Sequence, residues 1–119
     1  MEEILQINEV KEINFNNTHN KGLFISFEGG EGSGKSTQIK LLSNDLSKNN
    51  LPFILTREPG GTKSAESIWS LILKDYFNKK EKEKFDIYTD TLLYLAARNE
   101  HIKNKIKPAL KKKTSCYLW

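Results

Sequence analysis

The chain has 119 residues, of which 37% are hydrophobic and 29% charged, a size and composition that fit one globular domain and exclude a second large one. No apolar run approaches the roughly 20 residues that a membrane helix needs, and the acidic start, residues 1–5, is not followed by an apolar signal segment. We therefore expect no membrane association and a cytoplasmic location. The only cysteine is Cys116 and the only histidines are His19 and His101, which excludes an intrachain disulfide and argues against a Cys/His zinc site.

The formal net charge of +4 comes from one end of the chain. Residues 101–119 carry six lysines and no acidic side chain, which leaves 13 basic and 15 acidic side chains, a net charge of −2, in residues 1–100. The lysine run 111–113 is typical of a solvated surface rather than of a recognition patch. We expect no binding of nucleic acid.

Strand and helix signals alternate through the first half of the chain. Residues 1–21 have scattered apolar positions and predict an N-terminal extension. The apolar run 23–27 ends in glycines and predicts a buried parallel strand, and the run 52–56 predicts a second strand. Between them, apolar residues at helical spacing predict a helix over 35–48.

Two further helices are predicted after the second strand. The first would place apolar residues on one face, namely Ala65, Ile68, Trp69, Ile72 and Tyr76. A charged run at 79–84 predicts a solvated turn. The next helix is expected over 89–107, ending before Pro108, and would turn Leu92, Leu95, Ala96 and Ile102 toward the core. This order of elements predicts a parallel α/β fold.

A phosphate-binding loop is predicted between the first strand and the first helix. Its sequence is Gly29-Gly30-Glu31-Gly32-Ser33-Gly34-Lys35-Ser36, followed by Thr37, and it matches G-x-x-x-x-G-K-[ST] in the strand and helix context that this loop requires. Glycines let backbone N–H groups turn around an anion at the positive end of the helix. Lys35 can then reach the β- and γ-phosphates, and the hydroxyl of Ser36 suits Mg²⁺. The alternative is a glycine-rich turn that happens to precede a helix.

Acidic residues near this loop leave two interpretations open. Glu31 would repel phosphates unless it holds a sugar hydroxyl or a metal, so it is either a substrate ligand or a solvent-facing loop acid. Glu28, just before the loop, is favoured as a hydrogen-bonded acid at the end of the strand over an outer partner of a metal.

A charged turn follows the second strand. It reads Thr56-Arg57-Glu58-Pro59-Gly60-Gly61-Thr62, and it places a cation and an anion at the carboxyl end of a parallel strand, where open α/β sheets bind ligands. On the third helix, Tyr94 and Arg98 are four residues apart and share a face. An aromatic ring beside a guanidinium suits a stacked, hydrogen-bonded base, but the spacing alone favours a core tyrosine and a surface arginine.

The loop from Phe27 to Gln38, the Thr56–Thr62 turn and the run Leu93-Tyr94-Leu95-Ala96-Ala97-Arg98 together resemble bacterial thymidylate kinases. The resemblance covers about residues 22–110 and implies the fold of a P-loop nucleoside monophosphate kinase. It also implies transfer of the γ-phosphoryl group of ATP to dTMP with Mg²⁺, and a homodimer. Lys35 and Arg57 would be the catalytic cations.

The resemblance also implies the contacts to dTMP. Glu31 would lie near the deoxyribose 3′-hydroxyl, Glu58 beside the dTMP phosphate, Tyr94 against the thymine, and Arg98 within reach of the base.

The sequence departs from the family pattern at two places. Trp69 stands where the resemblance expects an arginine on the dTMP phosphate, and we interpret it as a core aromatic. After residue 110 a divergent tail, 111–119, replaces the family's third strand and its Asp-Arg pair, and no lid arginines follow. We therefore expect a truncated kinase with impaired turnover. There are three alternatives. The chain could be an active kinase whose missing parts come from another chain, a non-catalytic nucleotide-binding remnant, or another P-loop nucleotide kinase.

The tail has one expected structural role. The family's third strand lies between the first two, so its loss would leave their backbone groups without partners. We expect residues 114–119 to fill this gap as a strand.

Overall fold

A computed structural model describes residues 22–119, so the expected extension over 1–21 lies outside the described residues. The element order is strand, helix, strand, two helices, a π-helical turn, a short helix and a final strand. This alternation of strands and helices agrees with the predicted α/β fold. Within residues 22–119, no helix is long and apolar enough to cross a bilayer.

Three parallel strands form the sheet. They are β1 (Phe24–Ser26), β2 (Phe53–Thr56) and β3 (Ser115–Leu118), in the order β1-β3-β2. Tyr117 of β3 is in register with Ile25 of β1 and with Leu55 of β2. The prediction that the tail joins the two separated strands is therefore confirmed.

The tail strand has the burial of a central strand. Successive residues of a strand point to opposite faces of the sheet, and both Cys116 and Tyr117 are fully buried. The ring of Tyr117 meets that of Phe53 edge-on, with 6.1 Å between centroids. Burial raises the pKa of the Cys116 thiol, so this side chain packs as a small neutral group. The divergent tail thus supplies much of the core of the sheet.

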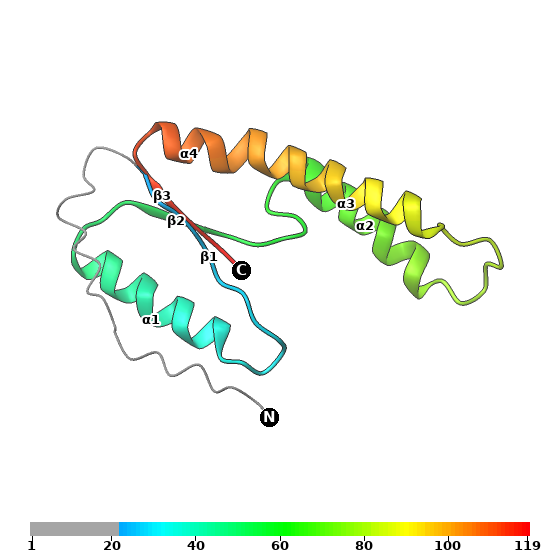
Figure 1. Ribbon diagram of the computed structural model, residues 1–119, viewed down its shortest axis with the longest axis horizontal. Helices are drawn as coiled ribbons and strands as arrows, with labels where there is room; N and C mark the ends of the chain where they lie inside the picture. Colours follow the sequence, from blue (N-terminus) through cyan, green and yellow to red (C-terminus); the bar gives the residue numbers. More distant parts are fainter. Residues whose placement is uncertain (1–21) are drawn as a thin grey trace, which may run out of the picture.

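Helices lie on both sides of the strands. In Figure 1, α1 (Lys35–Lys48) lies on one side of the three strands and α4 (Lys107–Lys111) on the other. The first helix has the predicted bounds and buries Ile39 and Leu46. It begins directly after the glycine-rich loop, which fixes the loop at the carboxyl edge of the sheet.

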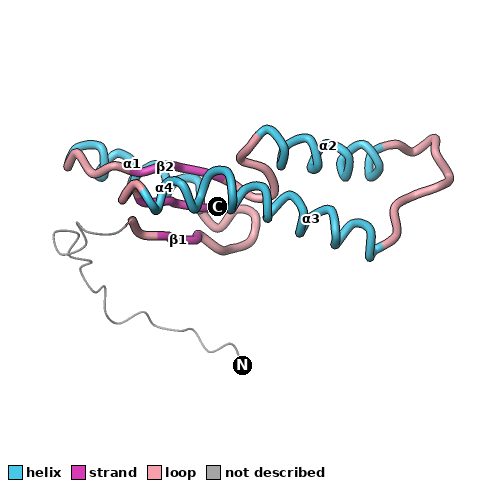
Figure 2. The backbone as a smooth tube through the Cα atoms, turned by 90° about the horizontal axis from the view of Figure 1, so that it is seen from above, coloured by secondary structure: helices cyan, strands magenta, loops and turns pink. Residues whose placement is uncertain are grey.

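Two longer helices form an arm that extends away from the sheet (Figures 1 and 2). They are α2 (Lys63–Phe77) and α3 (Ile87–His101). Side chains cap both N-termini, since Thr62 Oγ1 accepts from the amide of Ala65 at 3.2 Å and Asp86 Oδ1 from that of Thr89 at 2.7 Å. Such caps stabilise a helix by roughly 1 kcal/mol each.

The third helix does not end before Pro108, contrary to the sequence prediction. A π-helical turn, η2 (Ile102–Ile106), links α3 to α4. The amide of Lys107 donates to the carbonyl of Ile102, five residues back. This wider turn relieves the clash between a proline ring and the preceding turn, so the helix continues to Lys111.

The prediction of which residues of this helix face the core is also wrong. Leu92 and Leu95 are 66% and 53% exposed, and Ala96 is exposed as well. The buried residues are Ala97 and His101. Within the arm, α3 packs against a single neighbouring helix, α2, so only a narrow stripe of its surface is buried. The buried stripe therefore lies beside the predicted one.

Candidate active site

The glycine-rich loop connects β1 to α1 and forms a concave backbone. Gly34 precedes α1 with φ 87° and ψ 12°, a left-handed conformation that glycine adopts without the steric cost of a side chain. Residues 30–37 line a cavity of about 440 Å³. The first amides of a helix have no partners within the helix, so this cavity can receive an anion at the positive end of α1.

Charged and hydroxyl side chains of the loop meet this cavity. Lys35 folds back along the loop, where its Nζ donates to the carbonyls of Gly29 and Gly30, the latter at 3.2 Å. Glu31, Ser33, Ser36 and Thr37 are exposed. The described residues contain no cluster of three or more His, Cys, Asp or Glu side chains. A cation at Ser36 would therefore take most of its ligands from phosphate and water oxygens, which is the coordination that Mg²⁺ prefers.

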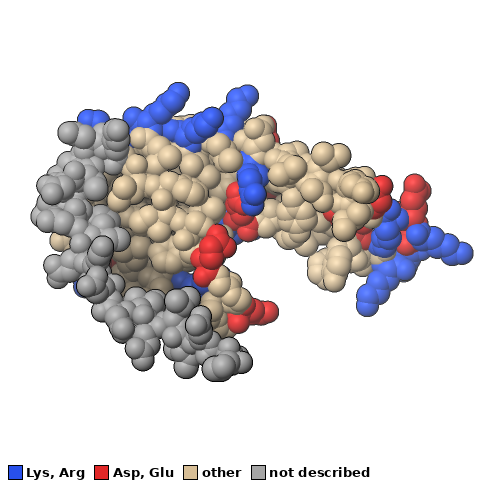
Figure 3. Space-filling model, viewed as in Figure 1, with Lys and Arg blue, Asp and Glu red and all other residues tan. Residues whose placement is uncertain are grey.

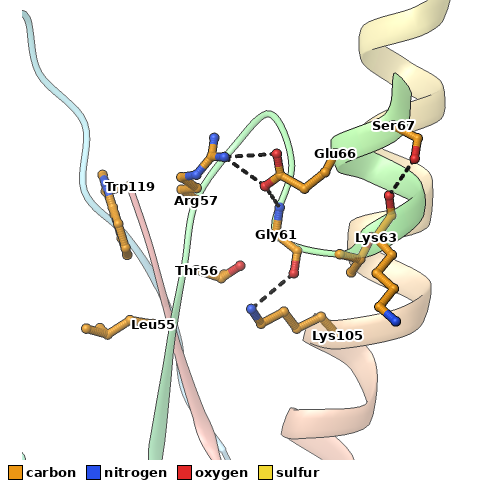
Figure 4. A pocket seen from close by; sticks show the side chains of 10 residues that line it. Leu55, Thr56, Arg57, Gly61, Lys63, Glu66, Ser67, Lys105 and Trp119 are labelled. Atoms are coloured by element: carbon orange, nitrogen blue, oxygen red, sulfur yellow. Dashed lines mark hydrogen bonds and ion pairs between the residues drawn. The ribbon is translucent and has the colours of Figure 1, made fainter. Parts of the chain in front are cut away.

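The turn after β2 is fixed by the tail strand and by α2. The amide of Glu58 donates to the carbonyl of Trp119 at 3.1 Å. Arg57 donates from Nη2 to both carboxylate oxygens of Glu66, at 2.7 and 3.0 Å, and from Nη1 to the carbonyl of Pro59. Glu66 also accepts from the amide of Gly61 (Figure 4). The expected catalytic cation Arg57 is thus engaged in holding the turn, with 44% of its side chain exposed.

The structure brings Glu58 and Arg98, two of the expected dTMP ligands, into direct contact with each other. The Nη2 of Arg98 lies 2.6 Å from Glu58 Oε2, and its Nε lies 2.9 and 3.1 Å from the two oxygens. Glu58, with the smaller contribution of Glu28, raises the pKa of Arg98. The pair remains open to ligands, because 58% of the Arg98 side chain and 20% of the Glu58 side chain are exposed.

An aromatic pair lies further along the arm. The rings of Trp69 and Tyr94 are 5.6 Å apart between centroids and tilted by 52°. Both line a cavity of about 390 Å³ between α2 and α3. Trp69 is half-buried, in keeping with its interpretation as a packing residue, whereas Tyr94 is 44% exposed and keeps a free surface for stacking.

The molecule has a hollow beside the arm. In Figure 3 the surface is concave between the arm and the rest of the chain, and acidic side chains border the hollow. The structure thus places Glu58, Tyr94 and Arg98 on the arm and its turn, and Lys35, Ser36 and Glu31 on the loop at the carboxyl edge of the sheet.

Two residues of this region are absent from the sequence prediction. Glu66 holds Arg57, and His101 lies fully buried beneath the Glu58 turn. The sequence gives only their positions on the helices. Glu66 falls in the first turn of α2, and His101 follows Arg98 by three residues, on the same helix face.

The first strand of this parallel sheet leads through a phosphate loop into a helix, and a charged turn follows the second strand. Together these features define the class of P-loop nucleotide kinases. The profile of the thymidylate kinase family matches residues 27–117. The chain is 45% identical over 92 residues to a thymidylate kinase of Clostridium novyi and 50% identical over 90 residues to one of Vesicomyosocius okutanii. The chain belongs to the thymidylate kinase family.

Solved structures agree with this assignment. The crystal structure of thymidylate kinase from Ehrlichia chaffeensis matches 82% of this chain with a TM-score of 0.63 and 40% sequence identity, over 50% of its own length. The alignments with the two bacterial relatives span 77% and 76% of this chain but 42% of each relative. The chain therefore spans about two-fifths of the length of these relatives.

Proposed function

We propose that this chain binds ATP and dTMP as a thymidylate kinase does, and transfers the γ-phosphoryl group to dTMP slowly. The observation that carries the proposal is the open ion pair between Glu58 and Arg98, at the carboxyl edge of a sheet that also presents the phosphate loop. Ligands of open α/β sheets bind at this edge. Such an enzyme would act in the cytoplasm, where both nucleotides occur.

ATP would be held by the loop residues Gly29, Gly30, Glu31, Gly32, Ser33, Gly34, Lys35, Ser36 and Thr37. Lys35 would exchange its two carbonyl acceptors for the β- and γ-phosphates, and Ser36 would bind Mg²⁺. The bound Mg²⁺ would neutralise the charge that develops on the phosphates. Arg57 is proposed as the second catalytic cation, approaching from the turn.

The nucleoside monophosphate would occupy the hollow beside the arm. Tyr94 presents an open ring surface for the thymine, and Arg98 can donate to the edge of the base. Glu58 would lie at the phosphate end, and Glu31 would accept the 3′-hydroxyl of the deoxyribose. The indole of Trp69 carries no charge, so it adds none for the dTMP phosphate.

Slow turnover is expected because the arginines of the site are already paired. The sequence contains two arginines, and each is held by a carboxylate in the described structure, Arg57 by Glu66 and Arg98 by Glu58. Removing one preorganised donor from a transition state typically costs about 100- to 1,000-fold in kcat. Binding without measurable turnover would identify a non-catalytic nucleotide-binding protein instead.

A homodimer is part of the proposal. Leu71 on α2 is 51% exposed, and Leu92 and Leu95 on α3 are 66% and 53% exposed, so the arm presents apolar surface that a second copy could cover. Sedimentation across a concentration series tests this. A dimer that the variant Leu92→Glu converts to monomers is expected, and a monomer at all concentrations would contradict it.

A coupled assay of ADP release tests the activity. The 119-residue chain is supplied with ATP, Mg²⁺ and one of dTMP, dCMP or AMP. We expect slow release that depends on dTMP and is lost in Lys35→Ala. Equal rates with AMP would identify another nucleotide kinase, and a rate unchanged by Lys35→Ala would show that the loop does not carry the reaction.

A further inference from the structure

His101 is buried between the end of β2 and the Glu58 turn. It is the last residue of α3 and is fully buried. Its Nε2 lies 2.6 Å from the hydroxyl of Thr56. Its Nδ1 lies 3.8 Å from Glu58 Oε1 and has no hydrogen-bond partner in the described structure. One imidazole nitrogen is therefore satisfied, and the other faces the carboxylate without yet binding it.

The position of the imidazole proton follows from its neighbours. Burial lowers the pKa of His101, Lys105 adds to this, and the charge of Glu58 opposes it. The ring is therefore neutral at neutral pH, with one nitrogen donating and one accepting. A lone pair on Nδ1 would face the negative charge of Glu58, whereas a proton there would be attracted to it. Electrostatics thus favours Nδ1–H, with Nε2 accepting from Thr56.

The backbone of Gly61, in the turn after β2, packs against the hydrogen bond between His101 and Thr56. A Cβ on Gly61 would lie 2.6 Å from both His101 Nε2 and Thr56 Oγ1. The backbone of the turn therefore lies directly over the hydrogen bond between them. Lys105, one helical turn beyond His101, donates from Nζ to the carbonyl of Gly61 at 3.1 Å (Figure 4). The imidazole is thereby held at a fixed position under Glu58.

Glu58 consequently lies between two donors of different exposure. Arg98 is 58% exposed and reaches Glu58 from the open side, while His101 is fixed on the buried side. If Arg98 turns toward a bound nucleotide, the carboxylate loses its ion pair. A shift of about 1 Å would bring Glu58 Oε1 within hydrogen-bond distance of Nδ1.

We propose that His101 is a positioning residue, which holds the Glu58 carboxylate through Nδ1–H and so releases Arg98 to bind the nucleotide. The assignment of that nucleotide as dTMP rests on the function proposed above. His101 itself does not touch the substrate. It acts by offering Glu58 a second partner, which lowers the cost of separating Glu58 from Arg98.

The ligand-free chain tests the placement of the proton. The sequence has two histidines, so His19→Ala leaves His101 as the only imidazole in a ¹⁵N NMR spectrum. At neutral pH we expect a protonated Nδ1 and an unprotonated Nε2. Thr56→Ser, which keeps the hydroxyl, should preserve this pattern, and Thr56→Val should weaken it. An Nε2–H tautomer or a charged ring in the native chain would overturn the proposal.

A matched pair of substitutions separates positioning from packing. An Asn amide nitrogen lies two bonds from Cβ, as Nδ1 does, so His101→Asn keeps a donor toward Glu58. The polar atoms of Gln lie three bonds from Cβ, as Nε2 does, so His101→Gln keeps the contact with Thr56 and loses the donor. We expect dTMP affinity within about threefold of native for the Asn variant and about tenfold weaker for the Gln variant. Equal losses would overturn the proposal.

The side-chain signals of the two arginines provide a readout that needs no nucleotide. The Nε–H resonance of Arg98, which bonds Glu58, should move in His101→Gln and stay near its native position in His101→Asn. Arg57, which binds Glu66 instead, is the internal control. If dTMP fails to bind even the native chain, the proposed function fails. The imidazole and arginine signals would still decide the role of His101, and an Arg98 signal that moves equally in both variants would overturn it.

Discussion

Glu58 and Arg98, forty residues apart in the chain, meet in an ion pair in which Arg98 Nη2 lies 2.6 Å from Glu58 Oε2. The pair joins the end of β2 to the open face of α3. It is exposed enough to be exchanged for contacts with a ligand. Ion pairs of this exposure contribute little to stability. We therefore expect the pair to contribute more to ligand affinity than to the free energy of unfolding.

Replacing Arg98 tests this distinction. Arg98→Lys keeps the charge but loses the planar fork that binds a carboxylate or a base at two points. We expect dTMP affinity to fall by about tenfold, while the free energy of unfolding changes by less than about 0.5 kcal/mol. Calorimetric titration and urea denaturation measure the two quantities.

The control is Lys80→Ala, in the exposed turn between α2 and α3, which should leave both quantities at their native values. A stability loss in Arg98→Lys as large as its loss in affinity would assign the ion pair a structural role.

Gly61 should tolerate no side chain. Its φ of 85° is rarely adopted by other residues, and a Cβ would lie 2.6 Å from His101 and from Thr56. We expect Gly61→Ala to lower the free energy of unfolding by about 1 to 3 kcal/mol, from strain and overpacking. Gly30→Ala is the matched control, because nothing lies within 4 Å of the Cβ it would add. Equal stabilities of the two variants in urea would show that the turn can move away from His101.

The hydroxyl of Tyr117 should be dispensable. It is buried without a hydrogen-bond partner in the described structure, and a buried polar group without a partner is destabilising. Tyr117→Phe keeps the edge contact with Phe53 and should leave stability unchanged or raise it. Tyr117→Ala should cost roughly 3 to 5 kcal/mol through the cavity it creates. A loss of more than about 1 kcal/mol in Tyr117→Phe would reveal a partner for the hydroxyl.

Stability should fall on acidification because of His101. Its pKa is lowered in the folded chain, first by burial, so the unfolded chain binds more protons between that lowered value and the usual pKa of about 6.5. The stabilisation is fully present above the usual pKa and is lost as the pH falls through this window. Melting temperatures between pH 7.5 and 5.0 measure the effect. His101→Asn should flatten the dependence, and an equally steep dependence in that variant would assign the effect to other groups.

The glycine-rich loop and the helix after it could be predicted from short sequence patterns. The helix over 35–48 and the place of the loop before it were predicted correctly, because glycine spacing, Lys35 and Ser36 specify them within one short segment. The position of β3 was also correct, although Phe24 and its partner Cys116 lie 92 residues apart. The resemblance placed a third strand between the first two, and two parallel strands without that central partner leave backbone groups unsatisfied. The family resemblance named Glu58 and Arg98 as separate dTMP ligands, and their direct contact was not predicted.

The failures arose where the answer depends on tertiary packing. The leucines of α3 were expected in the core, since periodicity shows which residues share a face but not how much of that face a neighbour covers. The continuation past Pro108 needed a π-helical turn, which has no simple sequence signature. His101 was counted only as a metal ligand that could be excluded, because nothing in the sequence shows that Thr56 and Glu58 would lie against it.

The most direct test is an NMR titration of the ¹⁵N-labelled 119-residue chain with ATP, Mg²⁺ and dTMP. We expect ATP with Mg²⁺ to shift the amides of residues 29–37 and dTMP to shift the Arg98 Nε–H signal, with Lys35→Ala abolishing the first response and His101→Gln weakening the second. If both nucleotides leave these signals unmoved at millimolar concentrations, the loop and the Glu58–Arg98 pair do not form a nucleotide site in this chain.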